Sequence, residues 1–324
     1  MGRAPTDWDA RIGRRLKLRD LHMLFAVVRA GSMAKAAGQL GVTQPAISQA
    51  IADLEATLGV RLLDRGPRGV APTLFGDALL KRGAEALDAL KQGVRDIEFL
   101  ADPSAGEVWV GASESYISGG YLSAIVTSLA RQYPRVVVHV VEANTAALEF
   151  HELRARKVDL MLGRISGQIR DDDLRVEPLY DEVIVVAAGR AHRHARRRKL
   201  ELSDLADDAW ILAPPNTVVR DLVGGAFRAR GMEPPRLSVT TYSMQLRMQL
   251  LSTGGYVSPV PESLLHYNAD RWSLCALPVT LGKPLPVVIV TLKDRTLSPV
   301  VQLFIDHARA MTKGMRTSTR QANP

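Results

Sequence analysis

The sequence predicts an α/β protein in three parts: a small helical domain, a long connecting helix, and a larger domain in which strands and helices alternate. Three observations support this prediction. Residues 31–55 have the pattern of two short helices joined by a tight turn, and residues 74–100 carry apolar residues at heptad spacing. From residue 107 onward, short apolar strands alternate with amphipathic helices, as in α/β folds.

The segment Gly31–Glu55 has the pattern of a helix-turn-helix, a motif that presents its second helix to DNA. Ser32 is a good N-cap for the first helix, and Gly41 ends that helix because glycine adopts the left-handed conformation without steric cost. Thr43 caps the second helix, and Pro45 lies in its first turn, where no backbone donor is needed. A generic helical hairpin on the protein surface is the alternative. The caps, the helix break at Gly41 and the proline together favour the DNA-binding motif. The side chains left to face DNA are Gln44, Ser48 and Gln49.

A wing is predicted directly after this motif. Residues 58–65 have the pattern of a strand, and residues 65–69 would form the wing tip, where Arg65 and Arg68 lie beside glycines that let the backbone approach phosphate. The charge distribution agrees, because residues 1–70 hold 11 of the 42 Lys and Arg residues but only 6 of the 34 Asp and Glu residues. Phosphate neutralisation explains this skew, whereas a basic surface kept for solubility explains only the net charge of +8.

Residues 74–100 predict a long helix with an apolar seam. Seam residues recur at alternating four- and three-residue steps, which favours pairing with a second helix. They are Leu80, Ala84, Leu87, Leu90, Val94 and Ile97. Packing of this face on the helix's own domain is the alternative reading.

Residues 107–311 predict a parallel sheet with crossover helices. A second unit begins near residue 182, and the chain returns to the first near residue 285, so we expect two lobes. A helix over residues 298–311 closes the domain, and the residues after it are expected to be a disordered tail.

Hydroxyl-bearing segments follow several of the predicted strands. In open α/β sheets, ligands bind beyond the carboxyl ends of the strands, where helix N-termini favour small anions. Any one of these segments is as well explained as an ordinary N-cap, but their convergence on one cleft favours a binding site, and Arg164 could assist there. The candidate residues are Ser113, Ser115, Thr145, Pro215, Asn216, Thr217 and Ser243.

The chain resembles LysR-type transcriptional regulators over nearly its whole length. The matching segments are AVVRAGSMAKAA, LGVTQPAISQAIADLE, LGVRLLDR and TLFGDALL. The resemblance implies a winged helix-turn-helix at residues 18–76 and a linker and dimerisation helix at 77–104, between an N-terminal extension at 1–17 and a tail at 313–324. It also implies a bilobal effector domain at 105–312, similar to periplasmic binding proteins, with lobe I at 105–181 and 283–312 and lobe II at 182–282.

The resemblance also implies a function. We expect a sequence-specific regulator that binds double-stranded DNA as a homodimer or homotetramer, contacts RNA polymerase, and responds to a small anionic or polyhydroxylated metabolite. The segments WILAPPNTVVR and LPVVIV resemble a subgroup associated with catabolic genes, so a catabolic or transport operon is the expected target. The expected DNA-binding residues are Ser32, Thr43, Gln44, Pro45, Ser48, Gln49, Arg65 and Arg68. Where the family often has basic residues, the second helix has Gln49, Ala50, Ala52 and Asp53, so more phosphate contacts must come from the wing.

Other classes of protein fit less well. A solute-binding receptor would share the bilobal domain, but residues 1–17 lack the apolar core of an export signal, and a cytoplasmic location is expected. A cytosolic enzyme would need a catalytic constellation, and the sequence suggests neither catalytic residues, nor a cofactor, nor a metal. His192 and His194 have metal-like spacing but lie in a loop expected to be exposed. Cys275 is the only cysteine, so the chain forms no internal disulfide.

Overall fold

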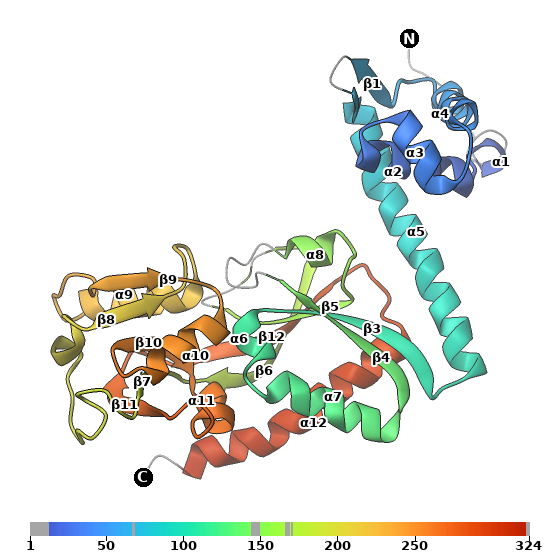
Figure 1. The fold of residues 1–324 in the computed structure, drawn as a ribbon. Coiled ribbons are helices and arrows are strands. Elements are labelled where there is room, and N and C mark those ends of the chain that lie inside the picture. The colour runs from blue at the N-terminus through green and yellow to red at the C-terminus, as the bar shows by residue number, and fades with distance from the viewer. Residues whose placement is uncertain (1–12, 67–68, 144–149, 166–168, 170, 322–324) are drawn as a thin grey trace. The chain divides into compact units, whose positions relative to one another are not determined.

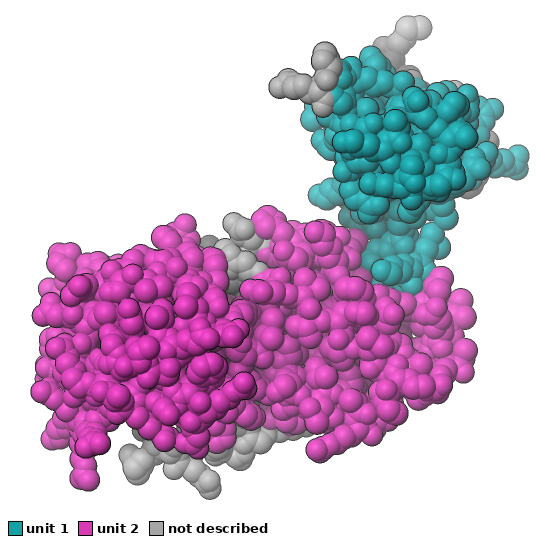
Figure 2. Space-filling view, viewed as in Figure 1, with its two compact units in different colours: residues 1–92 teal, residues 93–324 magenta. Residues whose placement is uncertain are grey.

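The computed structural model describes residues 13–66, 69–143, 150–165, 169 and 171–321 (Figure 1). The chain forms two compact units, residues 1–92 and residues 93–324 (Figure 2). Of the sequence-predicted site residues, Arg68 and Thr145 lie outside the described residues.

The first unit is a helical domain with a two-stranded wing. Its elements are α1 (Gly13–Arg15), α2 (Leu18–Ala30), α3 (Met33–Leu40), α4 (Gln44–Leu58), β1 (Leu63–Gly66), β2 (Gly69–Pro72) and the first part of α5 (Leu74–Ala101). The antiparallel pair β1–β2 is the predicted wing. The core of this first unit contains the fully buried Leu24, Ile47 and Ile51, and Leu80 and Leu87 of α5 pack against it.

The predicted caps of the helix-turn-helix are confirmed. The Ser32 side chain accepts from the Lys35 backbone N–H, and the Thr43 side chain accepts from that of Ala46. Gly41 adopts the left-handed conformation that ends α3, with φ of 64°. Because these local signals fix both helix starts, the register of α4, and hence its exposed face, follows from the sequence.

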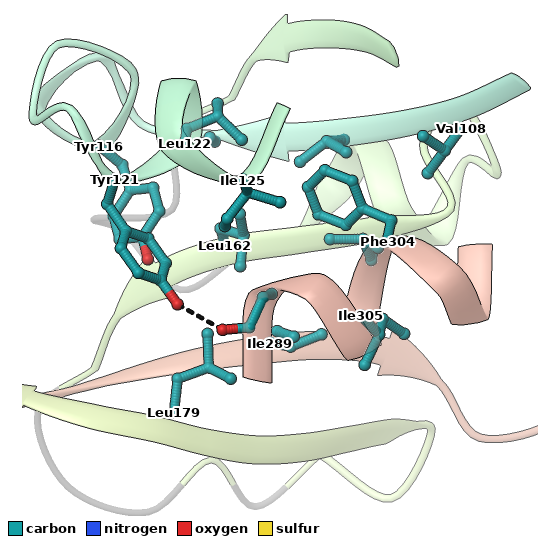
Figure 3. Packing of buried hydrophobic residues seen from close by; sticks show 14 of the residues in the cluster. Val108, Tyr116, Tyr121, Leu122, Ile125, Leu162, Leu179, Ile289, Phe304 and Ile305 are labelled. Atoms are coloured by element: carbon teal, nitrogen blue, oxygen red, sulfur yellow. Dashed lines mark hydrogen bonds between the residues drawn. The ribbon is translucent and has the colours of Figure 1, made fainter. Parts of the chain in front are cut away.

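Lobe I of the second unit is built on a five-stranded sheet of order β4-β3-β5-β12-β6. The strands are β3 (Ala105–Ala112), β4 (Arg135–Glu142), β5 (Leu160–Arg164), β6 (Leu174–Glu182) and β12 (Leu285–Leu292). Helices α6 (Glu114–Ile117), α7 (Tyr121–Gln132) and α12 (Pro299–Gln321) pack on one face. Helix α8 (His151–Arg154) packs on the other. Figure 3 shows the first of these cores, where Phe304 and Ile305 of α12 meet Ile125 of α7 and Ile289 of β12.

Lobe II is also built on a five-stranded sheet, whose strand order is β11-β7-β10-β8-β9. The strands are β7 (Ile184–Gly189), β8 (Ala209–Leu212), β9 (Leu237–Thr240), β10 (Tyr256–Pro261) and β11 (Leu274–Thr280). The 3-10 helix η3 (Leu202–Leu205) and α9 (Val218–Arg228) cover one face, whereas α10 (Met244–Ser252) and α11 (Glu262–Asn268) cover the other. The chain passes from β6 to β7 at Val183 and returns from β11 to β12 over residues 281–284.

Three features of this unit differ from the sequence-based expectations. The sheets are mixed rather than parallel, because β12 runs antiparallel to β5 and β6, and β7 runs antiparallel to β10 and β11. Strands β6 and β11 were not predicted as strands. Helix α12 continues to Gln321 instead of ending at Met311, so most of the expected tail is helical.

A buried carboxylate anchors the end of α5 to lobe I. Asp159 is 2% exposed and accepts hydrogen bonds from Arg95 of α5 at 3.0 Å and from the Trp109 backbone N–H at 2.8 Å. Arg295 also lies 2.9 Å from the same carboxylate. Two arginines therefore share one buried acid, and removing the acid would break both of these ion pairs.

We expect Asp159→Ala to lower the free energy of unfolding of the second unit by about 3–5 kcal/mol, the usual cost of breaking a buried ion pair. Urea denaturation followed by tryptophan fluorescence measures this, because Trp109, Trp210 and Trp272 all lie in this unit. Asp306→Ala is the control, since Asp306 pairs with Arg309 at a half-exposed site where a pair contributes about 0–1 kcal/mol. Equal losses in the two variants would contradict this role of Asp159.

Candidate functional site

The exposed face of α4 carries the polar residues expected to meet DNA. Gln44, Pro45 and Gln49 are exposed, and Ser48 is half-buried. The Gln49 amide donates to Asp53 at 2.8 Å, so this amide is held by its own helix. Ser48 donates to the Met33 sulfur at 3.3 Å, which leaves Gln44 as the exposed polar side chain in the first turn of α4.

The wing is fixed to the helical domain by backbone contacts. The Val70 N–H donates to the Gly31 carbonyl at 3.0 Å. A Cβ added at Gly69 would lie 2.7 Å from that carbonyl oxygen, so the close approach requires glycine there. Arg65 is exposed on β1 near the wing tip.

The apolar seam of α5 divides into two parts. Leu80 and Leu87 pack on the core of their own domain, and Gly83 lets α2 cross closely, since a Cβ there would meet Leu21 at 2.9 Å. For these two residues the structure thus shows the alternative reading, packing on their own domain. The later seam residues are exposed: Leu90 by 52%, Val94 by 54% and Ile97 by 68%.

A cavity of about 360 Å³ lies between the two lobes of the second unit. Its polar lining residues are Ser113, Glu114, Ser115, Glu142, Arg164, Thr217, Tyr242 and Arg247. Its apolar lining residues are Ala143, Ala213, Val218, Val219, Met244, Pro259 and Pro261. The cavity thus combines apolar surface with a few convergent polar groups, as small-molecule sites do.

One side of the cavity is a hydrogen-bonded chain that leads to the crossing between the lobes. Ser113 and Ser115 are joined at 3.2 Å, and Arg164 donates to the Ser115 hydroxyl at 3.1 Å. Arg164 also donates to Glu182 at 3.2 Å, and both side chains are buried. Glu182 in turn accepts from the Ser263 hydroxyl of lobe II at 2.9 Å. A ligand that contacts the serines therefore touches a network that spans both lobes.

Glu114, which lies between these two serines in the sequence, brings its carboxylate to the start of α10. Its carboxylate accepts from the backbone N–H groups of Met244 and Gln245. Burial raises the pKa of Glu114, whereas these two hydrogen bonds lower it. Arg247 is 4% exposed and donates to the carbonyls of Thr241 and Pro259. Burial lowers the pKa of Arg247 to about 10, so it remains cationic at neutral pH.

The structure brings only some of the sequence-predicted effector residues to this cavity. Ser113, Ser115 and Thr217 line it, but Pro215 and Asn216 are exposed and are not among its lining residues. Ser243 is also outside the lining, because its hydroxyl caps α10 by accepting from the Leu246 N–H at 3.2 Å.

Sequence reasoning missed three charged residues of the cavity: Glu114, Glu142 and Arg247. Glu114 immediately follows a predicted serine, and Glu142 closes a predicted strand, so their positions beyond strand ends were available signals. Arg247 gave no signal, because it reads as an ordinary polar residue within a helix.

The expectation of a solvated loop at His192 and His194 was wrong. Both side chains are 6% exposed and lie 3.8 and 3.6 Å from the buried Asp208. Burial is the main reason that the pKa of His192 is lowered. The basic run that follows, residues 196–199, is exposed as expected.

None of the helices in the described part of the chain combines the length and the hydropathy of a membrane-spanning segment. That same part of the chain holds no group of three His, Cys, Asp or Glu side chains placed to bind a metal ion. Cys275 is half-buried and carries a free thiol.

Two family models match this chain and together cover most of it. The "LysR substrate binding domain" matches residues 101–313, and the "Bacterial regulatory helix-turn-helix protein, lysR family" matches residues 18–77. The chain is 27% identical to the HTH-type transcriptional regulator GbpR of Azospirillum brasilense, over 95% of this chain and 90% of that protein. It is also 27% identical to the uncharacterized regulator YdcI of Escherichia coli K12, over 91% and 96% of the two chains.

Solved structures share the fold. Full-length CbnR complexed with its target DNA matches with a TM-score of 0.64 at 24% identity, over 91% of this chain and 99% of that chain. A full-length OxyR variant from Pseudomonas aeruginosa matches with a TM-score of 0.65 at 21% identity, over 91% and 95%. The helix-turn-helix, the two-lobed domain and both family models agree: the chain belongs to the LysR family and is a DNA-binding transcriptional regulator, not an enzyme.

Proposed function

We propose that this regulator reads double-stranded DNA in the cytoplasm as a homodimer or homotetramer and responds to a small metabolite, anionic or polyhydroxylated, bound between its lobes. The cavity carries the proposal, because it joins polar groups of both lobes around a space of about 360 Å³. Binding that changes the angle between the lobes would alter the placement of the DNA-binding domains through α5. We further propose that it acts through RNA polymerase on a catabolic or transport operon.

DNA readout is assigned to α4 and the wing. The exposed Gln44 at the start of α4 can bond an adenine edge with two hydrogen bonds in the major groove. The side chains of Ser32 and Thr43 cap α3 and α4, so we assign them the role of orienting these helices on DNA. Pro45, Ser48 and Gln49 complete the face of α4, and Arg65 and Arg68 of the wing are assigned to phosphate.

Dimerisation through α5 is supported by its later, exposed apolar residues. Leu90, Val94 and Ile97 lie one helical turn apart and find no cover within the described chain, as their exposures of 52–68% indicate. A second copy of α5 would cover them and would also match the two half-sites of a symmetric operator.

The general test is genome-wide mapping of the DNA that the protein binds, because the genes next to bound sites indicate both operator and effector. Recovery of no enriched sites would contradict the proposed regulation.

Gln44→Ala should weaken binding to the mapped operator by about 1–3 kcal/mol and leave binding to random DNA nearly unchanged, since base contacts carry the specificity. Arg65→Ala is the matched variant: it should weaken binding to both DNAs and lower the slope of log affinity against log salt by about one unit. Fluorescence anisotropy titrations at several salt concentrations measure both effects. Equal losses of Gln44→Ala on the two DNAs would overturn its assignment to base readout.

Leu90→Asp should weaken the dimer, because it places a charge in a desolvated helix pair. Analytical ultracentrifugation of the full chain should show a higher dimer dissociation constant, and affinity for a two-half-site operator should fall. Lys91→Asp puts the same side chain on the neighbouring exposed position and should leave the dimer intact. An unchanged dissociation constant for Leu90→Asp would refute the α5 interface.

Some metabolite is expected to shift operator affinity. Ser113→Ala should lower the affinity of the protein for that metabolite about fivefold, the effect of one lost hydrogen bond. Calorimetry with wild type and this variant measures the change. Ser123→Ala, on α7 and outside the cavity lining, should have no effect. If Ser113→Ala binds as tightly as wild type, the metabolite occupies another site; Thr145→Val tests the remaining predicted hydroxyl in the same way.

A further inference from the structure

The first turn of α10 has all its backbone donors occupied by the chain itself. The N–H groups of Met244 and Gln245 donate to Glu114. The N–H of Leu246 donates to the Ser243 hydroxyl, and that of Arg247 donates to the Ser243 carbonyl. A helix N-terminus normally favours an anion through such donors and the helix dipole. In this protein that anion is the carboxylate of Glu114.

The contact crosses between the lobes. Glu114 belongs to α6 of lobe I, α10 belongs to lobe II, and both Glu114 and Met244 line the cavity. An anionic group of a ligand could reach the α10 N–H groups only by displacing Glu114. The displaced carboxylate would then share the cavity with the ligand's charge and with Glu142, at a cost in like-charge repulsion.

The charges around the cavity do not favour an additional anion. Arg164 is already paired with Glu182. Arg247 is the other buried cation of the lining, and its charge interacts favourably with that of Glu114. The lining therefore has carboxylates that need hydrogen-bond donors rather than cations that need an anion.

The cavity also presents the hydroxyl groups of Ser113 and Ser115, which are joined to each other at 3.2 Å. The site thus combines acceptors on Glu114 and Glu142 with serine hydroxyls that can donate or accept. Hydroxyl groups satisfy both, because each donates and accepts.

We propose that Glu114 determines effector specificity: by occupying the N-terminus of α10, it excludes anions from the cavity and selects an uncharged ligand rich in hydroxyl groups. The inference rests on the proposed effector role of the cavity and narrows it to one of the two ligand classes. Removing Glu114 should convert the start of α10 into an anion site next to Arg247.

The test uses acetate as the probe, titrated into the full chain at constant ionic strength with chloride as the compensating salt. Calorimetry measures affinity, and the amide NMR shifts of Met244 and Gln245 locate the binding. Wild type should show no shift of these amides. Glu114→Ala should bind acetate at least about tenfold more tightly than wild type, because an internal competitor that fills the site lowers the apparent affinity by the fraction left open.

Two further variants secure the interpretation. Glu114→Gln keeps the shape and one acceptor but removes the charge, so it should show a smaller gain, and it provides the result if Glu114→Ala fails to fold. Glu142→Gln removes a carboxylate from the same cavity without touching the α10 contact and should gain little. A gain in neither Glu114 variant, an equal gain in Glu142→Gln, or acetate-dependent shifts of Met244 and Gln245 in wild type would each overturn the proposal. None of these readouts uses DNA or an effector, so failure of the regulatory proposal would be seen separately, as the absence of any metabolite that alters operator binding.

Discussion

The buried carboxylate of Glu182 is the constraint on which the cavity depends. It lies at the crossing from lobe I to lobe II and is 3% exposed, so its charge must be met by donors from the protein. Arg164 and Tyr180 supply donors from lobe I, and the hydroxyl and backbone N–H of Ser263 supply donors from lobe II. Loss of any of these hydrogen bonds would leave part of the buried charge of Glu182 without a donor. The two lobes are therefore held together at this point. Arg164, fixed in this way, in turn positions Ser115.

Local signals in the sequence were sufficient for the helical domain but not for the sheets. Ser32, Gly41 and Thr43 act within a few residues of their own position, and such short-range effects can be read directly from sequence. Strand direction depends on which distant strand lies alongside, and a buried strand has the same apolar pattern whether it runs parallel or antiparallel. The reversed strands β7 and β12 were therefore predicted as strands, but not with their direction.

The candidate site shows the same division. Hydroxyls that follow strands were predicted because their position is set by the strand itself, as for Ser113 and Thr217. Arg247 and the pair His192 and His194 were not, because their burial results from packing against elements distant in sequence. For the histidines the decisive neighbour is Asp208, which lies beyond η3 and directly before β8. Long or titratable side chains are thus the residues whose roles sequence reasoning most easily misassigns.

In the proposed mechanism, ligand binding acts on lobes that are already bridged by Glu114. A ligand can shift an equilibrium between two lobe arrangements only by its difference in affinity for them. A hydroxyl-rich ligand would bind without breaking the contact of Glu114 with α10, so its difference in affinity would come from contacts with the cavity carboxylates and the serine network. Through Glu182 that network reaches Ser263 of lobe II, and α5 is anchored to lobe I through Arg95 and Asp159. Because both connections are buried and charge-paired, a change in lobe angle would reach α5 as movement of a rigid body rather than be lost in loops.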